Sequence, residues 1–156
     1  MDQAINYIKG DATAPEGEGN RIIVHVCNDL GGWGRGFVVA ISRRWKEPEA
    51  AYRGWHGEPD FALGAVQLVQ VEPTLWVANM IGQHGLKRTP AGPPIRYDAV
   101  ETALTTVAEH ARELDASVHM PRIGCGLAGG RWEEIEPIIG RTLIKNGVPV
   151  TVYDFD

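Results

Sequence analysis

The stretch RIIVHVCNDLGGWGRGFVVAISRRW, residues 21–45, decides the fold. Residues 21–27 are almost continuously apolar and rich in β-branched side chains, which is typical of a central strand covered on both faces. The glycine-rich segment 28–36, called loop one below, cannot continue a regular element. Residues 37–45 then repeat apolar side chains at helical spacing. This order of strand, glycine-rich loop and helix predicts an α/β unit.

The rest of the chain repeats this alternation. The patterns predict strands at 4–9, 64–71, 75–81, 117–120 and 148–155, and helices at 49–55, 97–114 and 132–145. Asn146-Gly147 would cap the last helix. We therefore expect one domain, residues 1–156, of the α/β class, a three-layer α/β/α sandwich around a mixed central sheet.

A second glycine-rich segment, residues 121–130 or loop two, lies between a predicted strand and the helix that begins at Trp132. Backbone N–H groups at such turns and helix starts form concave anion sites, and glycine lets the backbone approach a diphosphate. Two such loops predict phosphate binding. Neither is a Walker sequence or a clean G-x-G-x-x-G, so nucleoside triphosphate hydrolysis and dinucleotide redox chemistry lack their signatures.

Composition limits the remaining classes. The net charge of -5 argues against direct nucleic-acid binding. No secretory signal or apolar run of membrane-spanning length occurs, so we expect a cytoplasmic protein that does not bind membranes. The two cysteines are too few for a four-cysteine metal site, and His25-x-Cys27 is the one close pairing. We predict no metal site and no cofactor.

The glycine-rich loops and the ends of the chain resemble a known family. The matching strings are Tyr7-Ile8-Lys9-Gly10-Asp11, His25-Val26-Cys27-Asn28, Trp33-Gly34-Arg35-Gly36, Met120-Pro121-Arg122-Ile123-Gly124-Cys125-Gly126-Leu127 and Thr151-Val152-Tyr153. Together they resemble the macro domains, in particular the branch of terminal ADP-ribose protein glycohydrolases and the yeast-type ADP-ribose 1″-phosphate phosphatases. The resemblance implies the macro domain fold and a partner that is ADP-ribose or an ADP-ribosylated protein.

The resemblance also implies residue roles. Asp11 would accept hydrogen bonds from the adenine edge, Ala12 would add a backbone contact, and Asn28 would face the distal ribose. The two loops would wrap the diphosphate and distal ribose, and Phe155 would lie near adenine. The implied ligand-binding set is Asp11, Ala12, Asn28, Gly32, Trp33, Gly34, Arg35, Gly36, Gly124, Cys125, Gly126, Leu127, Ala128, Gly129 and Phe155.

Several of these residues also have plain structural interpretations. Asp11 is either the adenine acceptor or a solvated turn residue, and Phe155 lies either near adenine or in the core. Trp33 is either exposed on its loop or buried in the core. Arg35 is either a phosphate ligand or a solvated arginine. We interpret His25 as a core histidine and Cys125 as a small packing residue.

The sequence departs from the glycohydrolase branch at two positions. That branch places a lysine and an aspartate where this chain has Gln83 and Ala128. A lysine adduct is therefore not expected, unless Lys87 substitutes. The remaining catalytic candidates are Asn28, Asp29 and His84, although Asp29 could equally cap a turn and His84 could be a surface residue.

Three functions follow from these residues. The first is binding of ADP-ribose with water-mediated hydrolysis of ADP-ribosyl esters on acidic side chains of proteins, that is, an ADP-ribosyl hydrolase for de-ADP-ribosylation. The second is an ADP-ribose 1″-phosphate phosphatase. The third is a non-catalytic reader of ADP-ribose.

Overall fold

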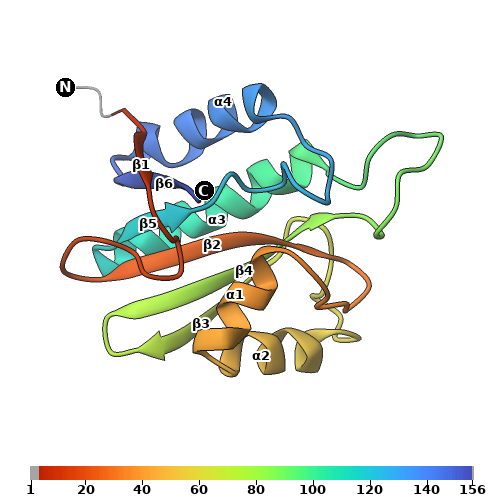
Figure 1. Ribbon diagram of the computed structural model, residues 1–156, viewed down its shortest axis with the longest axis horizontal. Helices are drawn as coiled ribbons and strands as arrows, with labels where there is room; N and C mark the ends of the chain where they lie inside the picture. Colours follow the sequence, from red (N-terminus) through yellow and green to blue (C-terminus); the bar gives the residue numbers. More distant parts are fainter. Residues whose placement is uncertain (1–3, 156) are drawn as a thin grey trace.

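A computed structural model describes residues 4–155, and their strands and helices follow one another in the predicted order (Figure 1). In chain order the elements are β1 (Asn6–Lys9), β2 (Arg21–Asn28), α1 (Phe37–Arg44), α2 (Glu47–Trp55), β3 (Val66–Glu72), β4 (Leu75–Gln83), α3 (Tyr97–Leu114), β5 (Ser117–Met120), α4 (Trp132–Thr142), the 3₁₀ turn η1 (Ile144–Asn146) and β6 (Val150–Asp154).

The sheet is mixed, as expected. Its six strands lie in the order β1-β6-β5-β2-β4-β3, and every neighbouring pair is parallel except β3 and β4. The antiparallel pair is a hairpin: its strands were predicted at 64–71 and 75–81, and Pro73-Thr74 forms the turn between them. β2 lies between β4 and β5, and its interior is buried, which explains the continuous apolar run of residues 21–27.

Helices cover both faces of the sheet and make the predicted three layers. Figure 1 shows α1 and α2 on one side of the strands, and α3 and α4 on the other. The α3–α4 side holds the larger apolar core, which includes Val100, Leu104 and Ile135. The α1–α2 side holds a separate core around Ile23, Ile41 and Tyr52. The apolar stripe of α3 therefore packs on the sheet as its spacing indicates.

The prediction of one helix over 132–145 was wrong at its end. The α-helix stops at Thr142, and Ile144–Asn146 forms a 3₁₀ turn. The N–H groups of Val148 and Gly147 donate to the carbonyls of Leu143 and Ile144, the pair of hydrogen bonds that ends a helical segment at a glycine. Gly147 then takes the left-handed conformation (φ 78°), so the predicted glycine cap is confirmed, although it closes the 3₁₀ turn.

The parallel strands place the loops of interest at one edge of the sheet. Loop one follows the carboxyl end of β2, loop two follows β5, and Asp11 comes two residues after β1. Ligands of open α/β sheets bind at this edge. Among residues 4–155, no helix is long and apolar enough to cross a membrane.

Candidate functional site

A cleft runs along the carboxyl edge of the sheet between the two glycine-rich loops. It consists of two adjoining hollows, of about 220 Å³ and about 500 Å³, which share Gly36, Phe37 and Pro121 in their walls. Small-molecule sites in proteins span about 300–1,000 Å³. The larger hollow lies beside Asp11 and Phe155, and the smaller one extends between the loops toward Gln83.

The Asp11 end of the cleft combines one carboxylate with apolar surface. Asp11 Oδ1 accepts hydrogen bonds from the N–H and hydroxyl of Thr13 at 2.8 and 2.7 Å, and Arg44 Nη2 lies 3.5 Å from Oδ2. Partial burial acts to raise the pKa of Asp11, but the Thr13 hydrogen bonds and the Arg44 charge outweigh it and lower the pKa. Asp11 is therefore ionised at neutral pH. Phe155 lines this hollow and is 80% exposed, so its core-packing alternative is wrong.

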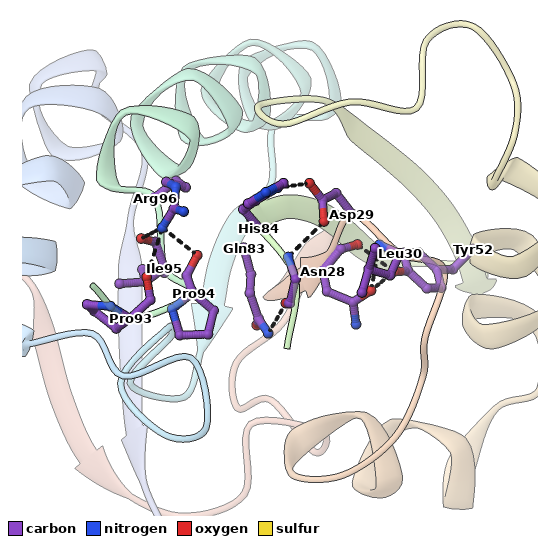
Figure 2. Close-up of polar contacts among 11 residues, drawn as sticks. Asn28, Asp29, Leu30, Tyr52, Gln83, His84, Pro93, Pro94, Ile95 and Arg96 are labelled. Atoms are coloured by element: carbon purple, nitrogen blue, oxygen red, sulfur yellow. Dashed lines mark hydrogen bonds and ion pairs between the residues drawn. The ribbon is translucent and has the colours of Figure 1, made fainter. Parts of the chain in front are cut away.

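Loop one is held in shape by Asn28. Its Oδ1 accepts the N–H groups of Leu30 and Gly32, and its Nδ2 donates to the Gly32 carbonyl at 2.7 Å. The Tyr52 hydroxyl donates to both the carbonyl and Oδ1 of Asn28 (Figure 2). The Asn28 amide is thus engaged within the protein, and it is not in the wall of either hollow. Its predicted contact with the distal ribose stays a prediction.

Trp33 lies on the inner side of loop one. It is 8% exposed, its indole N–H donates to Ser42 Oγ at 2.8 Å, and its ring packs against Tyr52 and the edge of His25. Of its two interpretations, burial in the core is correct. Arg35, by contrast, is exposed and lines the smaller hollow.

Loop two is shaped by its own backbone. The Gly130 N–H donates to the Gly124 carbonyl at 2.7 Å, and a Cβ at Gly130 would lie 2.4 Å from that oxygen. Gly124 is left-handed (φ +72°), and a Cβ there would lie 2.7 Å from Ile95. Gly126 lines the hollow, does not have a positive φ, and has open space around it. The backbone requirement for glycine therefore falls on Gly124, Gly130 and Gly129, which is also left-handed (φ +76°).

Other loop-two residues divide between wall and support. Gly126 and Leu127 are exposed and line the cleft, and Leu127 approaches Gly36 of loop one. Ala128 also lines the smaller hollow although it is largely buried, and its carbonyl accepts the Ile95 N–H at 3.1 Å. Cys125 is half-buried and packs against the larger core, in agreement with a packing role.

At the Gln83 end, two catalytic candidates contact each other. His84 Nδ1 and Asp29 Oδ2 are 2.6 Å apart, and Asp29 Oδ1 accepts the Gly85 N–H at 2.9 Å (Figure 2). Partial burial acts to raise the pKa of Asp29, but the Gly85 and His84 hydrogen bonds outweigh it and lower the pKa. Gln83 lines the cleft, whereas Asp29 and His84 are not in the walls of the two hollows. Their catalytic roles stay predictions.

The sequence interpretation missed three contributors. Tyr52 fixes Asn28 from α2, Arg44 contacts Asp11 from α1, and Arg122 lines the smaller hollow. Asp154 binds the Arg122 guanidinium at 2.6 and 3.1 Å, and the rings of Tyr7 and Trp132 lie against it. Arg122 belongs to one of the strings that carried the family resemblance. Its place in the cleft could not be predicted, because its partners come from three distant elements, β1, α4 and β6.

Comparison with known proteins identifies the family. The chain is 62% identical to a structure described as a macrodomain protein from Streptomyces coelicolor, with a TM-score of 0.87 over 97% of this chain and 99% of that one. The chain belongs to the macrodomain family. No family model matches the sequence. The resemblance stated from the two loops and the chain ends is thereby confirmed.

Further similarities extend to larger and more distant proteins. Chromodomain-helicase-DNA-binding protein 1-like of Mus musculus is 34% identical over 97% of this macrodomain, which spans only 18% of the mouse protein. ADP-ribose 1″-phosphate phosphatase of Meyerozyma guilliermondii is 24% identical, covering 96% of this chain and 97% of that protein. The fold also matches Thermosipho africanus DarTG in complex with ADP-ribose at 18% identity, with a TM-score of 0.71 over 86% of this chain and 38% of that one.

His25 of this macrodomain is a core residue, as interpreted. His25 is 2% exposed, and its Nε2 lies 2.6 Å from Asn79 Oδ1. Asn79 Nδ2 donates to Pro48 and Gln67, so Oδ1 is the acceptor and His25 Nε2 carries the proton. Burial lowers the pKa of His25 to about 4 and raises the pKa of Cys27. Among residues 4–155, no group of three or more His, Cys, Asp or Glu residues is placed to hold a metal ion.

Proposed function

We propose that this macrodomain binds ADP-ribose in the cleft and hydrolyses the ester that joins ADP-ribose to an acidic side chain of a protein. The observation that supports binding is the continuity of the cleft, from an ionised carboxylate at Asp11, past the loop backbones, to Gln83. This order suits adenine at Asp11, the diphosphate between the loops, and the distal ribose near Gln83. The ADP-ribose complex of a structural neighbour and the name of the phosphatase relative agree with this ligand class.

The Gln83 end favours water as the nucleophile. The glycohydrolase branch that the sequence resembles places a lysine and an aspartate at Gln83 and Ala128, and an amide and a methyl group can neither form an adduct nor take a proton. In our proposal water displaces the acidic side chain, and the products are free ADP-ribose, the carboxylate and a proton, which is released to solvent. Positioning and electrostatic stabilisation by the loop backbones then supply the acceleration.

The test is single-turnover release of ADP-ribose from protein modified on glutamate. We expect release above the spontaneous rate by the parent chain. If Asp29 and His84 act as a base, Asp29→Ala and His84→Ala should slow release by roughly 10²–10⁴-fold. Release that survives both changes would place catalysis in the loop backbone, and release at the spontaneous rate would make the protein a reader of ADP-ribose.

Asn28→Ala belongs in the same series with a folding control. Because the Asn28 amide holds Leu30 and Gly32, its removal should also loosen loop one. Tyr52→Phe removes one support of loop one and leaves the amide in place. Slower release in Asn28→Ala than in Tyr52→Phe, at equal stability, would support a direct role for the amide.

The phosphatase is the second candidate, because the fungal relative carries that name and matches nearly the full length of both chains. Turnover of ADP-ribose 1″-phosphate, measured beside the glutamyl ester with the same enzyme, decides between the two reactions. Faster release of phosphate than of ester-linked ADP-ribose would reverse our assignment.

A further inference from the structure

We infer that residues 84–94, called the arm below, form a docking element for an acidic segment of the protein that carries the ADP-ribose. This inference rests on the proposed function, because that function sets the distal ribose at the Gln83 end. Figure 1 shows the arm, in green, extending away from the body of the fold between β4 and α3.

The arm is rooted at the cleft. Gln83, which precedes it, lines the smaller hollow. Pro93 packs against Gly129, where a Cβ would lie 2.8 Å from the proline ring, and the Ile95 N–H donates to the Ala128 carbonyl at 3.1 Å. The C-terminal end of the arm therefore lies beside loop two. A polypeptide attached to the distal ribose would leave the cleft next to the arm.

The base of the arm is braced by polar contacts. Asp29 of loop one contacts His84 Nδ1 at 2.6 Å and accepts the Gly85 N–H at 2.9 Å. The Gln83 Nε2 donates to the Gly85 carbonyl, and the His84 N–H donates to the Pro94 carbonyl. On the other side, Arg96 Nη1 donates to the carbonyls of residues 93–95 (Figure 2).

The tip of the arm is also closed. Thr89 and Gly92 exchange two backbone hydrogen bonds of 2.9 Å each, and the Thr89 hydroxyl accepts the Ala91 N–H. A segment that is already bonded at its base and its tip loses little further conformational freedom when a partner binds. The arm is therefore suited to present side chains to a partner.

The side chains that the arm presents are apolar and basic. Leu86 is 56% exposed, and Lys87 and Arg88 follow it on the surface. Neither cation has a carboxylate within ion-pair distance among residues 4–155. The whole chain has a net charge of -5, so Lys87 and Arg88 form a local basic site on an acidic protein. An occupant with several carboxylates beside an apolar residue complements this surface.

The carrier side of the proposed reaction supplies such an occupant. The modified Asp or Glu loses its charge when it is esterified, so the carboxylates that face Lys87 and Arg88 must belong to neighbouring residues of the carrier. We therefore assign Lys87 and Arg88 to carboxylates that flank the modified residue, and Leu86 to a neighbouring apolar contact. The contacts are exposed, so they should weaken as salt is added.

The experiment measures the affinity of three probes. Two are peptides with ADP-ribose attached to a central residue through an amide in place of the ester, one flanked by glutamates and the other by glutamines. The third is free ADP-ribose. For the parent we expect a roughly threefold to tenfold preference for the glutamate-flanked peptide, because two exposed ion pairs are weak individually. Raising the salt concentration should reduce this preference.

The variant Lys87→Glu/Arg88→Glu should abolish or reverse the preference and leave the affinity for free ADP-ribose unchanged. The matched control is Arg112→Glu/Lys145→Glu. It makes the same charge change at exposed positions of α3 and η1. Both positions lie near the starts of the strands that follow, β5 and β6, and so at the edge of the sheet opposite the cleft. The control should keep the preference of the parent.

Three outcomes would overturn the inference. The first is equal affinity of the parent for both peptides, and the second is a preference that survives the arm variant. The third is that the arm variant loses as much affinity for free ADP-ribose as for the glutamate-flanked peptide, which would mean that the arm contacts the nucleotide. If the parent bound none of the three probes, the proposed function itself would fail, and this result is distinct from the other three.

Discussion

The carboxylate of Asp11 uses its two oxygens differently. Oδ1 accepts two hydrogen bonds from Thr13 within the turn, whereas Oδ2 has only the longer 3.5 Å contact with Arg44. Oδ2 is therefore the oxygen that can accept a hydrogen bond from the adenine amino group. We predict that Asp11→Ala weakens ADP-ribose binding by roughly 1.5–3 kcal/mol, the value of a hydrogen bond to a charged group. Calorimetric titration measures this difference.

Asp11→Asn separates recognition from turn formation. An asparagine keeps an acceptor for Thr13, but it replaces one oxygen with an NH₂ group that cannot accept from adenine. The parent should prefer ADP-ribose over the hypoxanthine analogue, which lacks the amino group, and Asp11→Asn should lose this preference. Equal affinity of both ligands for the parent would show that Asp11 does not bind adenine.

The sequence predicts the positions of some single residues of the site but not the contacts of others. Asp11 and Phe155 lie at the cleft because each follows a strand that ends at its edge. The sequence could not decide whether Trp33 is exposed or buried. A loop tryptophan is buried only if a partner such as Tyr52 packs on it from another element. The hydrogen bonds that the Asn28 side chain makes within its own loop could not be predicted from the sequence either, because they depend on the path of the backbone.

At the scale of the elements, the glycines of loop two have two different roles: Gly130 allows the backbone to close on itself, and Gly126 leaves room for a ligand. A Cβ at Gly130 would lie 2.4 Å from the Gly124 carbonyl oxygen, which is backbone and cannot move aside cheaply. Gly130→Ala should therefore distort the loop, cost roughly 1–3 kcal/mol of unfolding free energy, and weaken binding. Urea unfolding and ligand titration measure the two effects.

Gly126→Val is the complementary change. Gly126 has open space around its Cα and lines the cleft, so valine should fold normally and obstruct only the ligand. A stable Gly126→Val protein with reduced ADP-ribose affinity is the expected result. Unchanged affinity in that variant would show that loop two does not hold the diphosphate.

The elements differ in how well their patterns predict them. The apolar stripe of α3 and the β3–β4 hairpin follow from spacing and turn chemistry, and both were predicted close to their observed bounds. The change from α4 to a 3₁₀ turn was missed, because Ile144 and Lys145 still fit a helical pattern while β6 determines where the chain must bend. The bracing of the arm depends on Asp29, which lies 55 residues before His84.

At the scale of the whole molecule, two strands of the central sheet each carry a buried neutral histidine, His25 on β2 and His119 on β5. His25 packs against Trp33 on the α1–α2 side, and His119 bonds to Ser117 of its own strand and to the Tyr153 hydroxyl of β6. Burial lowers the pKa of both to about 4, and the Arg21 charge adds to the effect at His119. In the unfolded chain both would take up a proton near the ordinary value of about 6.5.

Below about pH 6.5 the unfolded chain binds protons that the folded chain does not, so acid favours unfolding. The contribution of each histidine is fully present above that pH and is lost as the pH falls toward about 4, by roughly 1.4 kcal/mol per pH unit. Carboxylates with lowered pKa, such as Asp29, add their own loss only below the ordinary carboxylate range.

Urea unfolding between pH 7 and pH 5 tests this prediction. The unfolding free energy of the parent should fall through this range with a slope that approaches roughly 2.7 kcal/mol per pH unit, because two groups contribute. His119→Gln removes one of them, so it should show about half that slope even if it is less stable at pH 7. An unchanged slope in His119→Gln would mean that His119 is protonated in the folded protein. The histidine ring signals in NMR would show this directly as a titration above pH 5.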